Sequence, residues 1–187
     1  MKFLINDKKW PAPGSVPFLE VIEQISSDID TSNINTFIEC GSGETGDNAY
    51  YFSNFFDVIS IENNPKLFKR YCNREGKNHN IKWILGDGVE NLTQILTENP
   101  EERFIILLDD HNSHQSFIKE EMEAIASCSN RKDHVIIIDD MKFAGIGTYP
   151  TIEQLDLHVR KINPEYKMKN TEIGHDIFVV YTAKEKR

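Results

Sequence analysis

The sequence has few cysteines and no long apolar run. Cys40, Cys72 and Cys128 are odd in number, and their spacing does not match that of a metal site. They predict reduced thiols in a cytoplasmic protein rather than a disulfide framework. No window approaches the roughly 18 uncharged apolar residues that suggest a membrane-spanning helix. The apolar run at residues 3–5 is too short for the core of a signal peptide. We therefore expect a cytoplasmic protein without a membrane segment.

Basic side chains are also scarce relative to acidic ones. The chain has 21 Lys and Arg against 30 Asp and Glu, which gives a formal net charge of −9. A protein that holds nucleic acid mainly through its phosphates needs clustered Lys and Arg. The charge balance therefore argues against a nucleic-acid partner, although it leaves room for a local basic groove.

The chain has no internal repeat, low-complexity tract or linker. At roughly 100–200 residues per domain, its 187 residues predict one domain spanning 1–187. Its hydrophobic content of 39% and charged content of 27% are close to globular averages, which excludes a disordered or coiled-coil chain. Within that domain, residues 1–32 read as an irregular lead-in with a helix over 18–29.

Seven segments of the sequence predict strands. Five of them are separated by helix-like segments, at residues 36–40, 57–62, 81–85, 103–109 and 134–139. The last two of these five are nearly continuous Ile, Leu and Val runs, as expected for parallel strands buried on both faces. Two more segments flank Gly174-His175, too close together for a crossover helix, and predict an antiparallel hairpin. The pattern indicates an α/β fold whose mostly parallel sheet has one reversed strand.

Helix signals occur between these strands. Asn64 followed by Pro65 is typical of a capped helix start. Thr151 and Gln154 have the spacing of a capping box. The segment 115–129 has apolar side chains at helical spacing and predicts a helix.

A glycine-rich loop follows the first expected strand. Residues 38–48 read IECGSGETGDN and contain Glu39, Gly41, Gly43 and Gly46 between a strand and an apparent helix. Glycines permit a tight turn and the close approach of a nucleotide to the backbone. The alternative is an ordinary turn that contains three glycines.

An acidic residue ends the second expected strand. Glu62 lies 19 residues after Gly43, where a carboxylate in a doubly wound fold can accept the hydroxyls of a ribose. The alternative is a solvated strand-end carboxylate. The loop and the acid together favour a nucleotide ligand more than either does alone.

The segment after the third expected strand completes a family resemblance. It reads GDGVENL, with Asp87 between two glycines. The chain from about residue 33 to 183 resembles the class I S-adenosylmethionine (SAM)-dependent methyltransferases, which have a Rossmann-like doubly wound fold. That resemblance implies a seven-stranded sheet of order 3-2-1-4-5-7-6 with strand 7 antiparallel.

The same resemblance implies positions for the cofactor SAM. Glu39, Gly41 and Gly43 would line its methionine side, Glu62 would hold the ribose, and Asp87 would face the adenine. The loop departs from the usual pattern, because Glu44 and Thr45 separate Gly43 from the next glycine.

Two pairs of aspartates end the fourth and fifth expected strands. Asp109-Asp110 and Asp139-Asp140 should meet at one edge of the sheet, where parallel strands deliver their carboxyl ends. Clustered carboxylates repel one another unless they are protonated or bridged by a cation. Oxygen ligands suit a hard ion such as Mg²⁺.

This pattern is similar to that of small-molecule and macrocin-type O-methyltransferases. The similarity implies a metal site for Mg²⁺ or Mn²⁺ at Asp109, Asp139 and Asp140. We expect Asp110 to be turned away from the metal or to contact its ligands from outside. It also places His111 beside Asp109 as the general base, since imidazole titrates near neutral pH. The alternatives are that the aspartates cap helices, that His111 is a surface residue, and that Lys142 neutralises the cluster.

These features predict a SAM-dependent methyltransferase that acts on a hydroxyl of a small molecule or sugar. No Asn/Asp-Pro-Pro-Tyr tetrad follows the fourth strand, so the sequence does not resemble the nucleic-acid amino-methylating enzymes. Two alternatives stay open: a non-catalytic module that binds SAM or a nucleoside, and an NAD(P)-dependent enzyme. The chain is short for a substrate lid, and a homo-oligomer could supply the missing wall.

Overall fold

The structure is a computed structural model, and it describes residues 29, 31, 33–74, 80–112, 115–171 and 177–183. The side chains of residues 111 and 112 are also outside the description. Nearly all of the expected lead-in and helix over residues 1–32 lies outside the described residues. In the described part, no helix is long and apolar enough to cross a membrane. Cys40, Cys72 and Cys128 are free thiols, as the sequence predicts.

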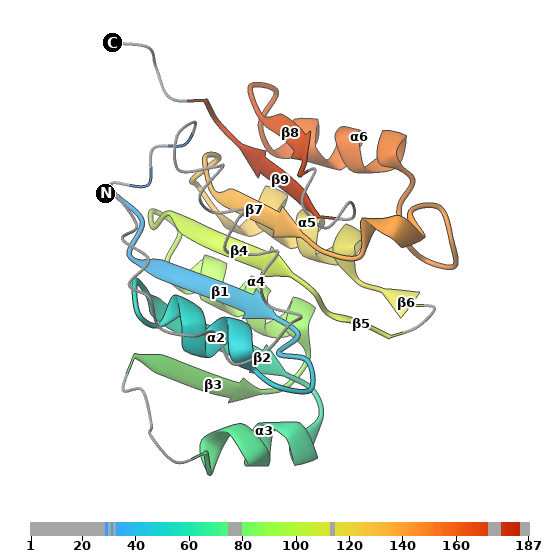
Figure 1. The fold of residues 1–187 in the computed structure, drawn as a ribbon. Coiled ribbons are helices and arrows are strands. Elements are labelled where there is room, and N and C mark those ends of the chain that lie inside the picture. The colour runs from blue at the N-terminus through green and yellow to red at the C-terminus, as the bar shows by residue number, and fades with distance from the viewer. Residues whose placement is uncertain are drawn as a thin grey trace.

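A seven-stranded sheet with the order β3-β2-β1-β4-β7-β9-β8 forms the centre of the fold (Figure 1). Its strands are β1 (Thr36–Cys40), β2 (Asp57–Glu62), β3 (Ile81–Leu85), β4 (Phe104–Leu108), β7 (Val135–Ile138), β8 (Lys167–Asn170) and β9 (Phe178–Tyr181). The first five strands pair in parallel, and β9 runs antiparallel to both of its neighbours. Counted within this sheet, the order is 3-2-1-4-5-7-6 with the seventh strand reversed, so the prediction is confirmed.

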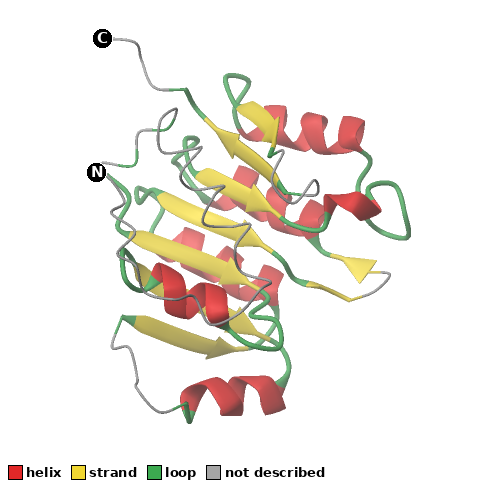
Figure 2. Ribbon diagram, in the orientation of Figure 1, coloured by secondary structure: helices red, strands yellow, loops and turns green. Residues whose placement is uncertain are grey.

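Helices cover the two faces of the sheet (Figure 2). They are α2 (Asp47–Phe52), α3 (Pro65–Cys72), α4 (Gly88–Glu98), α5 (Ile118–Cys128) and α6 (Ile152–Ile162), with a short 3₁₀ turn at η1 (Met141–Phe143). Helices α4, α5 and α6 pack side by side on one face, whereas α2 lies on the other. The chain is therefore doubly wound around its sheet.

Successive residues of the central strands feed two apolar cores. On β4, Ile106 and Leu108 pack toward α4 and α5, whereas Ile105 and Leu107 pack toward the face of α2. This alternation follows from the two-residue period of a strand. The strands β4 and β7 are buried along their whole length, as their continuous apolar runs predict. Each fully buried Ile or Leu contributes roughly 1.5–3 kcal/mol to the stability of the sheet.

The predicted helix starts are confirmed. The Asn64 side chain accepts a hydrogen bond from the backbone N–H of Lys66, and Pro65 is the first residue of α3. Thr151 and Gln154 form a complete capping box at the start of α6. These caps satisfy backbone donors that have no partner within the first turn of a helix.

One expected helix begins later than the sequence predicts. Residues 115–129 read as one helix, but α5 starts at Ile118 because Gln115–Ser116 form strand β6. This strand pairs antiparallel with β5 (His111–Asn112). The backbone N–H of Ser116 donates to the hydroxyl of Thr148 at 2.7 Å, which holds the segment out of the helix. The short hairpin β5–β6 therefore separates β4 from α5.

Candidate functional site

The predicted site residues gather where parallel strands end. In Figure 1 the arrowheads of β1, β2, β4 and β7 point to the same edge of the sheet. This carboxyl edge carries the glycine-rich loop after β1, Glu62 at the end of β2, and the aspartates after β4 and β7. Ligands of open α/β sheets bind beyond the carboxyl ends of the strands.

Glu39 is a fully buried acid on β1 at this edge. Its Oε2 accepts a hydrogen bond from the Ser60 hydroxyl at 2.5 Å, and Ser60 in turn contacts the Ser42 hydroxyl at 2.7 Å. Its Oε1 has no hydrogen-bond partner of good geometry, although the Asn48 side chain is close enough to lower the pKa of this carboxyl group. Burial is the main cause that raises the pKa of Glu39 to about 8; the charges of Asp109 and Glu62 act in the same direction, and the side chains of Ser60 and Asn48 act against it. An unfilled acceptor in a buried site costs free energy that a ligand's donor can recover.

Gly41 and Gly43 have different surroundings although both have a positive φ, of 87° and 62°. A Cβ on Gly41 would lie 2.3 Å from the backbone oxygen of Asp109, so this glycine lets the ends of β1 and β4 approach closely. A Cβ on Gly43 would meet nothing within 4 Å. The open space therefore lies over Gly43, whereas the backbone of Asp109 already occupies the space beside Gly41.

Glu62 is not a solvated carboxylate. It is only 5% exposed, and its Oε1 accepts a hydrogen bond from the backbone N–H of Asn64 at 2.7 Å. Burial raises its pKa. The alternative reading of a solvent-facing strand end is therefore wrong for this residue.

Asp87 and Asp110 lie at the start of α4. The Oδ1 of Asp87 caps this helix by accepting a hydrogen bond from the N–H of Glu90 at 2.9 Å. A Cβ on Gly88 would lie 2.5 Å from Oδ2 of Asp110, which places this carboxylate against the first residue of α4. Carboxylates are stabilised there by the helix dipole. Asp110 thus points at α4, and the contact of Asp87 with adenine stays a prediction.

The described residues give no support to the predicted metal site at Asp109, Asp139 and Asp140. In the described part of the chain, no group of three or more His, Cys, Asp or Glu could hold a metal ion. Asp140 has a left-handed backbone with a φ of 59°, and its carboxylate pairs with the ammonium of Lys142 at 2.6 Å. The Oδ1 of Asp139 accepts the N–H of Asp140 at 2.7 Å. Lys142, the alternative partner that the sequence offered, therefore neutralises part of the cluster, and Asp109 remains at the end of β4 beside Gly41.

Tyr149 is a residue of this edge that the sequence analysis missed. It is 3% exposed, and burial raises its pKa to about 12, with the charges of Asp140, Asp109 and Asp139 acting in the same direction. The phenol therefore lies near enough to the three predicted metal ligands for their charges to affect its pKa. No sequence motif marks Tyr149 as a site residue. It follows a loop with two glycines, and only the fold brings this loop back to the strand ends.

The hairpin after β4 and the loop after β7 are joined beside these aspartates. The Thr148 hydroxyl accepts from the N–H of Ser116 and donates to the carbonyl of Ser116 at 3.1 Å. The backbone of His111 belongs to this hairpin. Its side chain is outside the described residues, so its role as general base stays a prediction.

A second fully buried acid lies beneath the edge, on α5. Neither carboxylate oxygen of Glu121 has a geometrically acceptable hydrogen-bond partner, although the Cys40 thiol is adjacent. Burial raises its pKa well above the usual range, and the charge of Asp110 adds to the effect. Burial of this carboxyl group therefore favours its protonated form.

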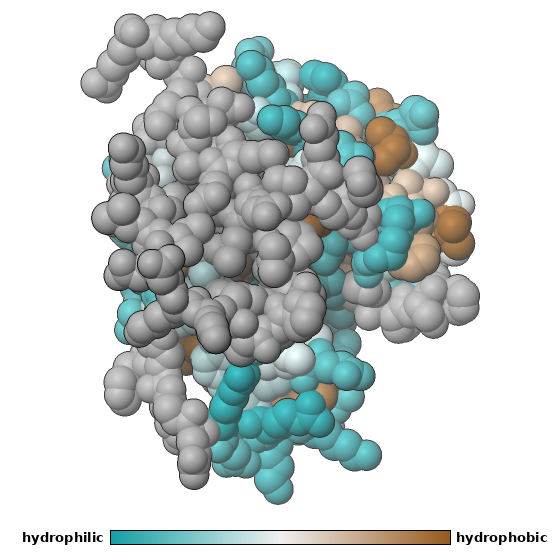
Figure 3. All heavy atoms as spheres, viewed as in Figure 1, coloured by the Kyte–Doolittle hydropathy of each residue, from teal (hydrophilic) through white to brown (hydrophobic). Residues whose placement is uncertain are grey.

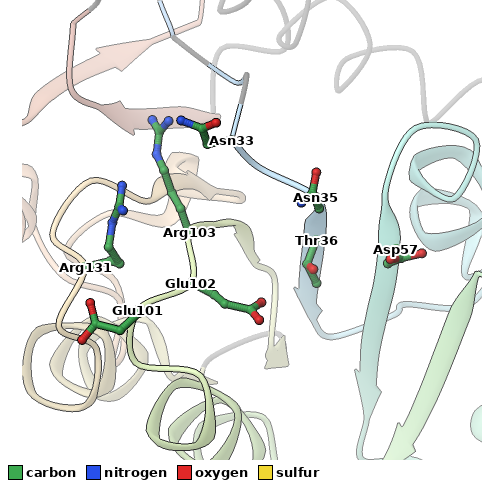
Figure 4. A pocket seen from close by; sticks show the side chains of 8 residues that line it. All are labelled: Asn33, Asn35, Thr36, Asp57, Glu101, Glu102, Arg103 and Arg131. Carbon is green, nitrogen blue, oxygen red and sulfur yellow. The ribbon is translucent and has the colours of Figure 1, made fainter.

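A polar hollow of about 530 Å³ lies at the opposite edge of the sheet (Figure 4). It is lined by Asn33, Asn35, Thr36, Asp57, Glu101, Glu102, Arg103 and Arg131. Both arginines already contact Asp133, Arg131 through two hydrogen bonds of 2.8 and 2.6 Å. None of the predicted cofactor residues lines this hollow.

Comparison with known proteins identifies the fold but no sequence relative. No protein-family model and no curated protein matches the chain. A SAM-dependent methyltransferase from Archaeoglobus fulgidus is similar in structure, with a TM-score of 0.62 and 12% identity over 92% of this chain and 95% of that one. The N-methyltransferase NodS from Bradyrhizobium japonicum has a TM-score of 0.55 and 12% identity over 94% and 100%.

A third similar structure was solved with a ligand. It is the 1,6-didemethyltoxoflavin-N1-methyltransferase of Burkholderia thailandensis with bound 1,6-didemethyltoxoflavin and S-adenosylhomocysteine, with a TM-score of 0.51 and 13% identity over 97% of this chain and 94% of that one. At such identities these likenesses establish the fold alone. The chain has the Rossmann-like fold of the class I methyltransferases.

Proposed function

We propose that this chain, which has the class I methyltransferase fold, is a SAM-dependent methyltransferase acting on a hydroxyl of a small molecule. The observation that carries the proposal is the buried Glu39 carboxyl group at the end of β1, whose Oε1 has no hydrogen-bond partner of good geometry. A doubly wound sheet binds its ligand at this edge. A ligand with a cationic donor would fill this oxygen and favour the ionised form of Glu39.

SAM fits the residues at this edge. Its amino group would fill the acceptor of Glu39, and its methionine part would pass over the open space at Gly43. Glu62 is buried 19 residues further along, at the end of the neighbouring strand, and would hold the ribose hydroxyls. An NAD(P) enzyme would use the same loop and acid, but its nicotinamide carries no amino acid group that would fill Glu39.

The bound cofactor supplies a sulfonium-activated methyl group. The chain's own task is to align the acceptor with that methyl and to remove a proton from it. Alignment alone accounts for much of the rate of such a transfer. We place the group that removes this proton at the end of β4. There Asp109 lies against Gly41, and the backbone of His111 follows.

The acceptor is proposed to be a small molecule without extended negative charge. Supporting this, the edge carries Asp109, Asp139 and Asp140, and the whole chain has a net charge of −9. The β5–β6 hairpin and the Thr148 loop are joined by the hydrogen bond between Ser116 and Thr148. Metal assistance is left out of the proposal because Lys142 pairs with Asp140. The free thiols fit a reducing compartment such as the cytoplasm.

Calorimetric titration of the protein with SAM, S-adenosylhomocysteine and NAD tests the cofactor. We expect both adenosyl sulfur compounds to bind and NAD not to bind. Glu62→Gln should weaken binding roughly 10- to 100-fold, as expected for a lost bond to a charged acceptor. Glu102→Gln, an exposed acid at the opposite edge, is the control and should have no effect. Binding of NAD alone would overturn the proposal.

The acceptor is tested with methyl-labelled SAM and matched small alcohols and amines. Two of the similar structures are named as N-methyltransferases, so amines belong in the panel. Transfer to a hydroxyl supports the proposal, and transfer to amines alone would reassign the acceptor atom. Binding of SAM without transfer to any member would favour a non-catalytic binding module.

A further inference from the structure

Three neighbouring side chains of α3 and its C-terminal end reach back to the glycine-rich loop. The Arg70 guanidinium donates to the carbonyl of Glu44 at 2.9 Å, and the Arg74 guanidinium donates to the carbonyl of Thr45 at 3.1 Å. The Tyr71 hydroxyl donates to the carbonyl of Gly43. Three consecutive carbonyls of one loop are therefore each bound by a side chain from one other segment. Here these side chains are called the α3 clamp, meaning Arg70, Tyr71 and Arg74.

The clamp is itself held in place by packing. Tyr71 is 2% exposed and stacks on the Trp83 ring, with centroids 4.8 Å apart. Arg74 lies over the Tyr50 ring, 4.4 Å from its centroid, and pairs with Asp47 at 3.3 Å. Figure 3 shows mainly hydrophilic side chains at the lower end of the molecule, where α3 lies. The clamp thus combines one buried anchor with two arginines at the surface.

Holding a carbonyl also orients the next N–H. In a trans peptide the two groups point in opposite directions. Because the carbonyls of Gly43 and Glu44 point to the clamp, the N–H groups of Glu44 and Thr45 point away from it. Gly46 donates to the carbonyl of Ser42 at 3.1 Å and closes the loop. The clamp therefore fixes the peptide planes beside the open space at Gly43.

The loop needs such support because of its sequence. The residues between Gly43 and Gly46 are Glu44 and Thr45, both exposed. Exposed loop residues without packed side chains gain order only from backbone hydrogen bonds and cost conformational entropy when they are fixed on binding. A loop that is ordered before the ligand arrives avoids that cost.

We propose that Arg70, Tyr71 and Arg74 are positioning residues that hold the glycine-rich loop in its ligand-binding shape. The proposal rests on the proposed function, since the ligand it concerns is SAM. None of the three touches the reacting atoms. They act on affinity by keeping the backbone of residues 43–46 in one conformation.

The test uses S-adenosylhomocysteine and four variants. Tyr71→Phe removes the hydroxyl and keeps the stacked ring, whereas Arg70→Ala and Arg74→Ala each remove one bond to the loop. We expect each to raise the dissociation constant roughly three- to tenfold, the worth of one hydrogen bond. Arg74→Lys keeps a cationic donor and should restore most of the affinity.

Two controls match these variants. Tyr50→Phe also removes a tyrosine hydroxyl from the same aromatic cluster, but this hydroxyl binds the carbonyl of Tyr71 at 3.2 Å and not the loop. Arg160→Ala removes an exposed arginine from α6 that pairs with Asp156. Neither control should change the affinity for S-adenosylhomocysteine.

Hydrogen exchange of the loop amides in the free protein separates this proposal from the proposed function. If the clamp is correct, its variants speed exchange at residues 43–46 while the thermal midpoint changes little. Faster exchange in a protein that binds no S-adenosylhomocysteine would keep the clamp and overturn the function. Unchanged exchange and unchanged affinity in all three clamp variants would overturn the clamp and leave the function standing. The clamp proposal would also be overturned if its variants and the two control variants lost the same affinity for S-adenosylhomocysteine.

Discussion

Glu39 combines full burial with one filled and one empty oxygen. Ser60 occupies Oε2, so the empty Oε1 is the atom that a cationic ligand would meet. Burial raises the pKa of Glu39 to about 8. At neutral pH the free protein therefore holds this group mostly protonated, whereas a cationic ligand favours the ionised form. Ligand binding and proton release should be linked at this residue.

We predict that the affinity for SAM rises with pH between about 6 and 7.5. One proton leaves Glu39 on binding, so the association constant should increase up to tenfold per pH unit. The range stops below the α-amino pKa of roughly 7.7–8.0, where the ligand itself loses charge. Calorimetry at four pH values measures the slope. In Glu39→Gln the slope should vanish, and an unchanged slope in this variant would place the proton elsewhere.

We predict that Gly41→Ala destabilises the fold more than Gly43→Ala. Both glycines have a positive φ, so both changes carry the roughly 1–2 kcal/mol of a left-handed alanine. Only at Gly41 does the added methyl meet a backbone atom, the oxygen of Asp109. Urea denaturation measures the difference in the free energy of unfolding. Equal losses would mean that the strand ends can separate without cost.

At the scale of elements, α5 places a buried acid with a raised pKa against the strand ends. Glu121 lies in the first turn of this helix, near Asp110 and Cys40. Its folded pKa is raised above that of the unfolded chain. The stability it contributes is therefore complete at low pH and is lost as the pH rises above the unfolded pKa of 4.5.

We predict that Glu121→Gln gains stability over the parent protein as the pH increases. The amide keeps the shape of the protonated acid and removes the cost of holding a proton. The difference in thermal midpoint between variant and parent should be small at pH 4.5 and larger at pH 8. The neighbouring Glu120→Gln is the control, since Glu120 is exposed. A difference that does not vary with pH would show that Glu121 is ionised in the folded protein.

The elements themselves were largely predictable from the sequence. Apolar runs such as 134–139 and the capping residues Asn64 and Thr151 report local physics, and each lies where it was expected. The hairpin β5–β6 was not predictable, because Ser116 is held by Thr148, 32 residues away. Its apolar neighbours have helical spacing, and nothing local reveals the competing contact.

At the scale of the whole molecule, the strand order determines which site residues meet. The sequence predicted that Glu39, Glu62 and Asp109 share one edge, because parallel strands end together. Their mutual effect on the pKa of Glu39 supports that prediction. The α3 clamp could not be predicted from the sequence. Its hydrogen bonds join residues 26 to 29 positions apart and depend on where α3 packs. The metal prediction is not supported at Asp140, where a left-handed turn brings Lys142 to the carboxylate.

The most direct test of the central claim is a crystal structure of the protein with S-adenosylhomocysteine. The molecule offers two edges of its sheet, the carboxyl edge with Glu39 and the amino edge with the polar hollow of about 530 Å³. We predict the ligand at the carboxyl edge, with its amino group within 3.2 Å of Oε1 of Glu39 and its ribose on Glu62, the reach of an N–H···O bond being roughly 3.2 Å. A ligand bound in the hollow beside Arg103 would contradict the account.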